Sequence, residues 1–225
     1  MTRKAGMIHG KQAGFSLVEI AVVLVIIGLL IGGILQGTEM IDNSRIKKAA
    51  TDYQAISTAY VAYQDRYQRL PGDDGALAVV TARGGDWARV TRAGNNNGAL
   101  AINLNATWNG GGEHAAVWQH LRAAGYISGD PSLQGVASQP RNAFGGLMGL
   151  TTANSHNNLR GLKMCMSQVP GKAAAALDLQ LDDGAPRTGD LRANQGVSGQ
   201  NTNPTNANPP AAYSEDQEYT MCKRI

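Results

Sequence analysis

The hydrophobic pattern begins with one unbroken apolar segment near the N-terminus. Residues 15–35 (FSLVEIAVVLVIIGLLIGGIL) contain a single charged side chain, Glu19. A helix of about 21 residues is roughly 31 Å long, close to the hydrocarbon thickness of a bilayer. Its aliphatic side chains favour insertion by about 7 kcal/mol, whereas a carboxylate in mid-membrane opposes insertion by about 3 kcal/mol. Residues 15–36 are therefore expected to form a transmembrane helix, in which Glu19 needs a specific role.

The helical pattern continues beyond the apolar segment. Apolar and aromatic side chains recur at alternating steps of three and four residues, which is typical of one face of an amphipathic helix: Ile46, Ala49, Tyr53, Ile56, Tyr60, Tyr63 and Tyr67. The helix should end at Leu70, because the residue before Pro71 disfavours the α region. Residues 37–70 are thus expected to be the amphipathic half of the same helix. Its tyrosines are interpreted as core packing rather than as an aromatic stack for electron transport.

The remaining residues, 71–225, should form a globular head with both helices and strands. Residues 113–126 and 172–183 are expected to be helices, and residues 77–92 are ambiguous, with a short helix as the best fit. Strands are expected at residues 159–169 and 188–193, and an edge strand at residues 218–223. Residues 195–210 are rich in Asn, Gly, Ser and Pro, which predicts a long exposed loop.

Composition and charge exclude some functional classes. The chain has 225 residues with 28 glycines and 5% aromatic residues, which indicates a small, loop-rich head. The net charge is +3, from 20 basic and 17 acidic side chains. The three basic residues of the leader, Arg3, Lys4 and Lys11, supply the whole excess, so the rest of the chain is neutral. This balance argues against a general nucleic-acid binder.

The basic leader and the apolar segment allow three interpretations. A secretory signal would have a shorter apolar region followed by a cleavage site, and a plain signal anchor would have no use for Glu19. The third interpretation is cleavage before the apolar segment, between Gly14 and Phe15. The two cysteines, Cys165 and Cys222, most simply form one disulfide in an oxidising compartment, and two unrelated reduced thiols are the alternative.

The segment Lys11-Gln-Ala-Gly14-Phe15-Ser-Leu-Val-Glu19 resembles the class III signal of type IV pilins and type II secretion pseudopilins. The resemblance implies that a prepilin peptidase cuts between Gly14 and Phe15, removes the leader 1–14 and N-methylates Phe15. It also implies that Glu19 acts in assembly. A buried carboxylate is less unfavourable beside an opposite charge, so Glu19 of one subunit is expected to pair with the Phe15 amine of a neighbour and to set the axial register.

The same resemblance implies an α+β pilin fold. In that fold a long N-terminal helix, membrane-spanning in its first half, packs on a small antiparallel sheet with extra helices. A C-terminal loop closed by Cys165 and Cys222 would then present variable surface. The expected partners are other pilin subunits, the prepilin peptidase, the assembly machinery and, before assembly, the inner membrane. The expected location is the inner membrane followed by a pilus at the cell surface, where adhesion, twitching motility or DNA uptake are the candidate tasks.

No catalytic or cofactor-binding motif accompanies this pattern. The sequence has no phosphate loop, no nucleophile and base at a known spacing, and no zinc signature. His114, His120 and His156 are interpreted as surface or satisfied core histidines. The loop at residues 95–97 carries amides where calcium loops carry acids, so a plain turn is expected and calcium binding stays an open alternative. We therefore expect neither enzymatic activity, nor a metal site, nor a cofactor.

Two alternatives to a pilus subunit remain. A type II secretion pseudopilin would keep the architecture and act in the periplasm. Many type IV pilins carry a proline at the position of Gln36, and its absence here leans toward a pseudopilin-like helix. The second alternative is a membrane-anchored binding domain that never polymerises and keeps its leader.

Overall fold

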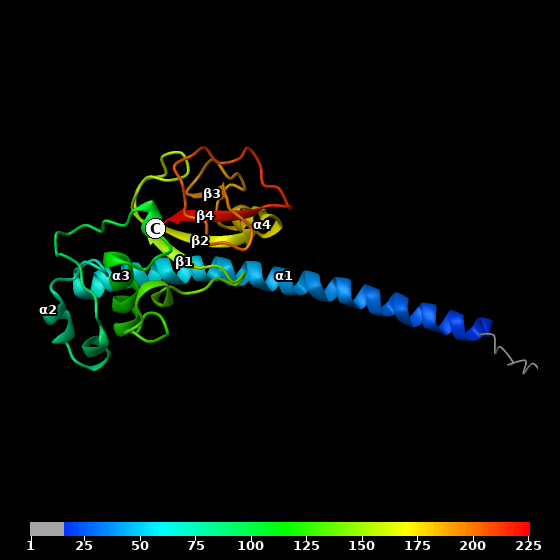
Figure 1. Cartoon of the computed structure of the whole chain (residues 1–225), viewed down its shortest axis with the longest axis horizontal. Helices are drawn as coiled ribbons and strands as arrows, with labels where there is room; N and C mark the ends of the chain where they lie inside the picture. The colour runs from blue at the N-terminus through cyan, green and yellow to red at the C-terminus, as the bar shows by residue number, and fades with distance from the viewer. Residues whose placement is uncertain (1–15) are drawn as a thin grey trace, which may run out of the picture. The chain divides into compact units, whose positions relative to one another are not determined.

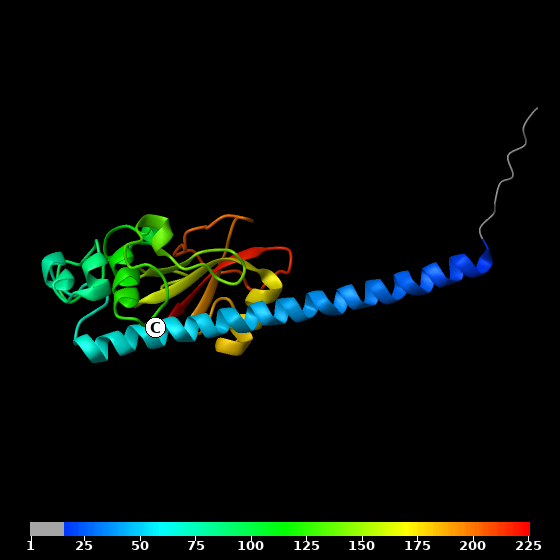
Figure 2. The same cartoon turned by 90° about the horizontal axis from the view of Figure 1, so that it is seen from below.

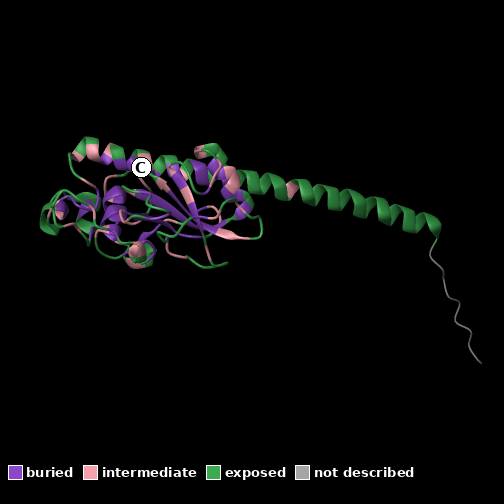
Figure 3. Cartoon of the chain, turned by 90° about the horizontal axis from the view of Figure 1, so that it is seen from above, coloured by how far each residue is buried: buried purple, intermediate pink, exposed green. Residues whose placement is uncertain are grey.

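The computed structural model describes residues 16–225 and divides into two compact units, residues 1–43 and 44–225 (Figure 1). Helix α1, Leu17–Tyr67, has 51 residues and contributes to both units. By length and composition its first half could cross a membrane. The large apolar side chains from Leu17 to Ile41 are exposed, as Figure 3 shows in green. This segment therefore has the apolar surface that a lipid bilayer or a bundle of helices requires.

The sheet of the second unit has four antiparallel strands in the order β1-β2-β4-β3. The strands are β1 Met148–Thr151, β2 Lys163–Pro170, β3 Leu191–Gln195 and β4 Glu218–Arg224. The expectation that β4 is an edge strand is wrong, because β4 pairs with β2 on one side and β3 on the other. Burial on both faces from Tyr219 to Cys222 is the property of a central strand.

Helix α1 after residue 44 runs along the sheet (Figure 2), and its side chains form the core with one face of this sheet. Tyr53, Tyr60 and Tyr63 are buried, and the Tyr53 hydroxyl donates a hydrogen bond of 3.0 Å to the backbone oxygen of Met221 in β4. Methionines provide most of the opposing surface: Met148, Met164, Met166 and Met221. The interpretation of the tyrosine stripe as core packing is confirmed.

The helices of the head agree with the sequence pattern in part. Helix α3, Gly112–Ala123, and helix α4, Gly171–Leu181, lie within two residues of the expected starts. The ambiguous residues 77–92 form two short pieces, α2 Leu77–Thr81 and a 3₁₀ helix Gly85–Arg89. Two further 3₁₀ turns span Leu104–Ala106 and Gly135–Ser138. Helix α1 ends three residues before Leu70, because Gln68 adopts a left-handed φ of 51°.

The second face of the sheet carries Cys165 and Cys222, with Trp108 and Leu147 packed against them. The segment expected to be an exposed loop is fixed to this face. The backbone oxygen of Thr202 accepts hydrogen bonds from Trp108 Nε1 at 2.8 Å and from the Thr220 hydroxyl at 2.7 Å. Most side chains of residues 195–210 are exposed as expected, but Pro204 and Pro209 are buried. Hydrogen bonds from Trp108 and from Thr220 of β4 thus order a loop that has little apolar surface of its own.

Trp108 can approach this face only because residue 149 of β1 is glycine. A Cβ atom added at Gly149 would lie 2.2 Å from the Thr107 oxygen and 2.8 Å from the Trp108 ring. We expect Gly149→Ala to lower the free energy of unfolding by about 1–3 kcal/mol, as overpacking usually does. Urea unfolding of the full chain in detergent micelles, followed by tryptophan fluorescence, measures this change. Gly196→Ala is the matched control, since its Cβ would meet its nearest atom at 3.4 Å; equal midpoints for the two variants would refute the steric argument.

Three histidines are buried in the head, and burial lowers the pKa of each from 6.5 to about 4: His114, His120 and His156. A histidine that is buried in its neutral form binds a proton at a higher pH in the unfolded chain than in the folded protein. Stability is therefore lost as the pH falls from 6.5 toward 4. Asp178 acts in the opposite direction. Burial raises the pKa of its carboxyl to about 6, so its protonation adds stability as the pH falls through 6.

We expect the three histidines to outweigh Asp178, so that the free energy of unfolding falls between pH 7 and pH 4.5. A shift from 6.5 to about 4 corresponds to about 2–3 kcal/mol per histidine at pH 4.5. His120→Gln should therefore reduce the difference between the two pH values by about 2 kcal/mol. Urea titrations at pH 7 and pH 4.5 check this, and an unchanged difference in the variant would contradict it.

Candidate functional site

The first turn of α1 is built around Ser16 and Glu19. The Ser16 hydroxyl oxygen accepts hydrogen bonds from the backbone N–H groups of Val18 at 3.2 Å and Glu19 at 3.4 Å. In return, the Ser16 N–H donates to Glu19 Oε2 at 2.8 Å. This reciprocal arrangement is a capping box, which satisfies N–H groups that have no partner inside the helix. The signal that could have found it is the Ser-x-x-Glu spacing of residues 16–19.

The capping box fixes the place of the Glu19 carboxylate. Its negative charge lies in the first turn, where the helix dipole stabilises an anion. Within residues 16–225 no hydrogen bond to the second oxygen, Oε1, is recorded, so one oxygen remains for a further cation or donor. Gly14 and Phe15, the expected cleavage positions, lie outside the described residues. Glu19 is therefore the one residue of the expected processing and assembly set, Gly14, Phe15 and Glu19, whose surroundings the structure gives.

The apolar helix after Glu19 has no break. It runs through Gln36 without interruption, and a Cβ added at Gly28, Gly32 or Gly33 would have no described atom within 4 Å. These glycines thus leave small, open positions along an exposed helix surface. Small residues of this kind allow close approach of a second helix.

The disulfide between Cys165 and Cys222 joins directly opposed residues of β2 and β4. The expected pairing is confirmed, with an S–S distance of 2.01 Å and a sequence separation of 57. By the chain-entropy estimate, closing such a loop stabilises the fold by about 4 kcal/mol. Both cysteines are fully buried, so the disulfide holds the centre of the sheet rather than an exposed loop.

The asparagine loop at residues 95–97 is arranged around a carboxylate of the protein itself. Asp73 accepts hydrogen bonds from the backbone N–H groups of Asn96 and of Gly98, the latter at 2.7 Å. Arg69 donates to the Asn96 side-chain oxygen at 3.0 Å. The loop therefore presents N–H donors to an anion, which is the opposite of what Ca²⁺ coordination needs.

The adjacent Asp74 attaches the end of α1 to the residues that follow. Its carboxylate accepts hydrogen bonds from the Tyr63 hydroxyl and, in bidentate geometry, from Arg83 at 2.6 and 3.0 Å. The Arg83 guanidinium in turn lies 4.8 Å from the Tyr67 ring centroid and 4.6 Å from that of Trp87. A buried carboxylate with this many donors is satisfied, so the network is structural.

One group of carboxylates in the described residues has ligand atoms close enough to share a metal: Asp178, Asp182 and Asp183. Each already accepts hydrogen bonds within the fold. Asp178 accepts from the Tyr213 hydroxyl at 2.5 Å, and Asp182 accepts from the Leu191 N–H at 2.8 Å. The cluster thus has a structural role between the end of α4 and the start of β3. The sequence pattern did not single out Asp178, which lies on the apolar face of α4.

The histidines also have structural partners. His120 Nδ1 accepts from the Gly72 N–H at 3.0 Å, and its Nε2–H donates to the Arg92 oxygen at 3.2 Å. His156 Nε2–H donates to the Thr220 oxygen at 3.1 Å. Their interpretation as core histidines agrees with these contacts.

We expect Ser16→Ala to weaken the first turn of α1 by about 1 kcal/mol, the usual value for loss of a serine cap. Amide hydrogen exchange of Val18 and Glu19, measured by NMR on the full chain in micelles, should become about fivefold faster. Ser44→Ala is the control, because Ser44 is exposed within the same helix. Equal exchange at Val18 in the wild type and in Ser16→Ala would show that the capping box does not form.

Comparison with known protein families gives a match for one segment near the N-terminus. Residues 9–35 match the family described as Prokaryotic N-terminal methylation motif. No curated protein sequence matches the chain. The match spans the leader end, Gly14, Phe15, the capping box and the apolar half of α1. Proteins with this motif are generally structural rather than enzymatic, and an apolar helix behind it indicates a membrane precursor. Residues 9–35 therefore carry a prepilin-type cleavage and methylation signal, which is typical of type IV pilins and pseudopilins.

Proposed function

We propose that this chain is a structural subunit of a type IV pilus filament. Residues 1–14 are the leader, which a prepilin peptidase removes between Gly14 and Phe15. Residues 15–36 hold the precursor in the inner membrane and later form the filament core. Residues 37–70 and 71–225 form the amphipathic half of α1 and the head. The observation that carries the proposal is an exposed apolar helix with one acid in its first turn, inside a prepilin-type motif.

The geometry of Glu19 supports a role in assembly. Glu19 already has Ser16 N–H on one oxygen, and Oε1 has no recorded partner among the described residues. Cleavage before Phe15 would create an ammonium group in the adjacent turn of each copy. A neighbouring copy displaced along the helix axis can bring its Phe15 amine to the open oxygen. In a low-dielectric environment this pairing would be strong enough to select one axial register.

A pseudopilin of a type II secretion system is the second candidate. The observation that favours it is the continuous helix through Gln36. Proline at this position interrupts helix hydrogen bonding, and α1 has no such interruption. A pseudopilin would use the same processing and the same Glu19 contact, and it would act in the periplasm with the secretion machinery.

Processing is tested by co-expressing the full chain with a prepilin peptidase and analysing the product by mass spectrometry. The expected product begins at N-methylated Phe15. A product that keeps residues 1–14 would overturn both candidates and would leave a membrane-anchored domain that does not polymerise. Long extracellular filaments that contain the chain would select the pilus over the pseudopilin.

Assembly is tested with Glu19→Ala. We expect normal processing of this variant and at least a tenfold loss of incorporation into filaments, because the register contact is absent. Glu39→Ala is the matched control, since Glu39 is an exposed acid on the same helix. Quantitative immunoblots of sheared filaments and of membranes measure both. Wild-type incorporation of Glu19→Ala would refute the pairing.

A further inference from the structure

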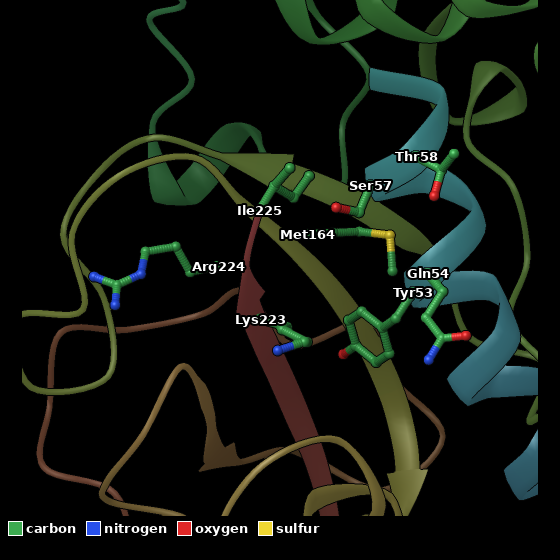
Figure 4. Close-up of a pocket in the computed structure, with 8 residues that line it drawn as sticks. All are labelled: Tyr53, Gln54, Ser57, Thr58, Met164, Lys223, Arg224 and Ile225. Atoms are coloured by element: carbon green, nitrogen blue, oxygen red, sulfur yellow. The ribbon is translucent and has the colours of Figure 1, made fainter. Parts of the chain in front are cut away.

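The second unit has a pocket between α1 and the far end of β4 (Figure 4). Its volume is about 190 Å³, and eight residues line it: Tyr53, Gln54, Ser57, Thr58, Met164, Lys223, Arg224 and Ile225. Four of them come from successive turns of α1, one from β2 and three from residues 223–225. The volume equals that of roughly six water molecules in the liquid, which is enough for a small organic ligand.

Lys223 places a positive charge in this pocket. In β4 its neighbour Met221 belongs to the core formed with α1, so the alternation along the strand turns Lys223 toward α1 as well. Figure 4 shows Lys223 beside the Tyr53 ring. Lys223 is half-buried, and no hydrogen bond or ion pair of its ammonium is recorded with any residue between 16 and 225. An ammonium group that lines a pocket and has no recorded partner among residues 16–225 can accept an anionic ligand.

Neighbouring charges do not neutralise Lys223. Arg224 lines the pocket too, but it points away in Figure 4 and forms an ion pair with Asp190. Across the strand pair, Lys163 lies opposite Arg224, and its ammonium donates to the Gly161 oxygen at 2.6 Å. Burial and the nearby Arg224 lower the pKa of Lys163 to about 8. Three basic side chains, Lys163, Lys223 and Arg224, lie at this end of the described sheet with two carboxylates, the Asp190 side chain and the backbone carboxylate of Ile225, so the local charge remains positive.

Polar groups of α1 complete one wall of the pocket. Ser57, Thr58 and Gln54 present two hydroxyls and an amide, and no side-chain hydrogen bond of these residues is recorded within residues 16–225. The opposite wall is apolar. The Tyr53 hydroxyl is bonded to Met221, so Tyr53 lines the pocket with the edge of a ring that is 3% exposed, and Met164 lines it with a side chain that is 1% exposed. An occupant should therefore combine one anionic head with a short apolar body.

We propose that this pocket binds a small carboxylate ligand, with the carboxylate on Lys223 and the α1 hydroxyls and the carbon chain against Tyr53 and Met164. A carboxylate accepts several hydrogen bonds in one plane and carries a single charge, which suits one ammonium and two hydroxyls. The proposal does not depend on polymerisation. A free small acid and an acidic side chain of a second copy share this chemistry, and the experiment separates the two sources.

The test uses the full chain in detergent micelles and butyrate as the probe. Saturation-transfer NMR titrations should give a dissociation constant of about 1–10 mM, as expected for a ligand of this size. Butyramide, the neutral analogue, should bind at least tenfold more weakly. Raising the salt from about 50 to 500 mM should weaken butyrate binding severalfold, because salt screens an accessible charge. Inorganic phosphate should bind more weakly than butyrate.

Lys223→Gln should weaken butyrate binding at least tenfold, whereas Lys172→Gln, which removes an exposed lysine of α4, should change it less than twofold. Thr58→Val keeps the shape and removes a hydroxyl, so it should weaken binding severalfold and tests the site even if Lys223→Gln unfolds.

Equal binding of butyrate and butyramide, no saturable binding, tighter binding of phosphate, or wild-type affinity in both Lys223→Gln and Thr58→Val would each overturn the proposal. If Lys223→Gln also weakens self-association, and butyrate does the same to the wild type, the carboxylate comes from a second copy; if neither changes self-association, the ligand is a free acid.

Discussion

Packing of one aromatic stripe of α1 against a methionine-rich face is the interaction on which the head depends. The sheet has only four strands, and its methionine-rich face needs a cover. Tyr53 provides that cover with a large ring whose hydroxyl is bonded to Met221. Tyr63 continues the stripe, packs against Tyr67 and His120, and has its hydroxyl bonded to Asp74. A tyrosine can be buried in this way because its ring contributes apolar area while its hydroxyl finds a partner. The helix thus acts as a structural element of the head as well as an apolar segment.

The head compensates for a low aromatic content by burying satisfied polar groups. Asp73, Asp74 and His120 are at most 4% exposed, and each bonds to backbone groups or to an arginine. Such networks specify one arrangement of loops, because a buried polar atom without its partner is expensive. They also make the fold sensitive to acid, since neutral histidines are part of the same interior.

The sequence predicted the helices and strands whose apolar side chains recur at regular spacing. The long helix, α3, α4 and β2 follow from apolar spacing, and the disulfide follows from having two cysteines behind an export-like N-terminus. Strand β1 was missed, because Met148-Gly-Leu-Thr151 is short and contains the glycine that Trp108 requires. The central position of β4 depends on pairing partners in β2 and β3 that are more than twenty residues away, and the local pattern carries no information about them. The order of the asparagine-rich loop likewise depends on donors that are distant in the sequence, such as Trp108.

The position of β4 has a consequence for the order in which the head is completed. Strands β2 and β3 do not pair with each other, and residues 218–224 fill the gap between them. Synthesis from the N-terminus produces α1 long before this strand. Strands β2 and β3 therefore stay unconnected in the growing chain until β4 has been made. Until Cys222 emerges, Cys165 has no intramolecular partner for oxidation. Formation of the disulfide between Cys165 and Cys222 therefore indicates that β4 has been inserted between β2 and β3.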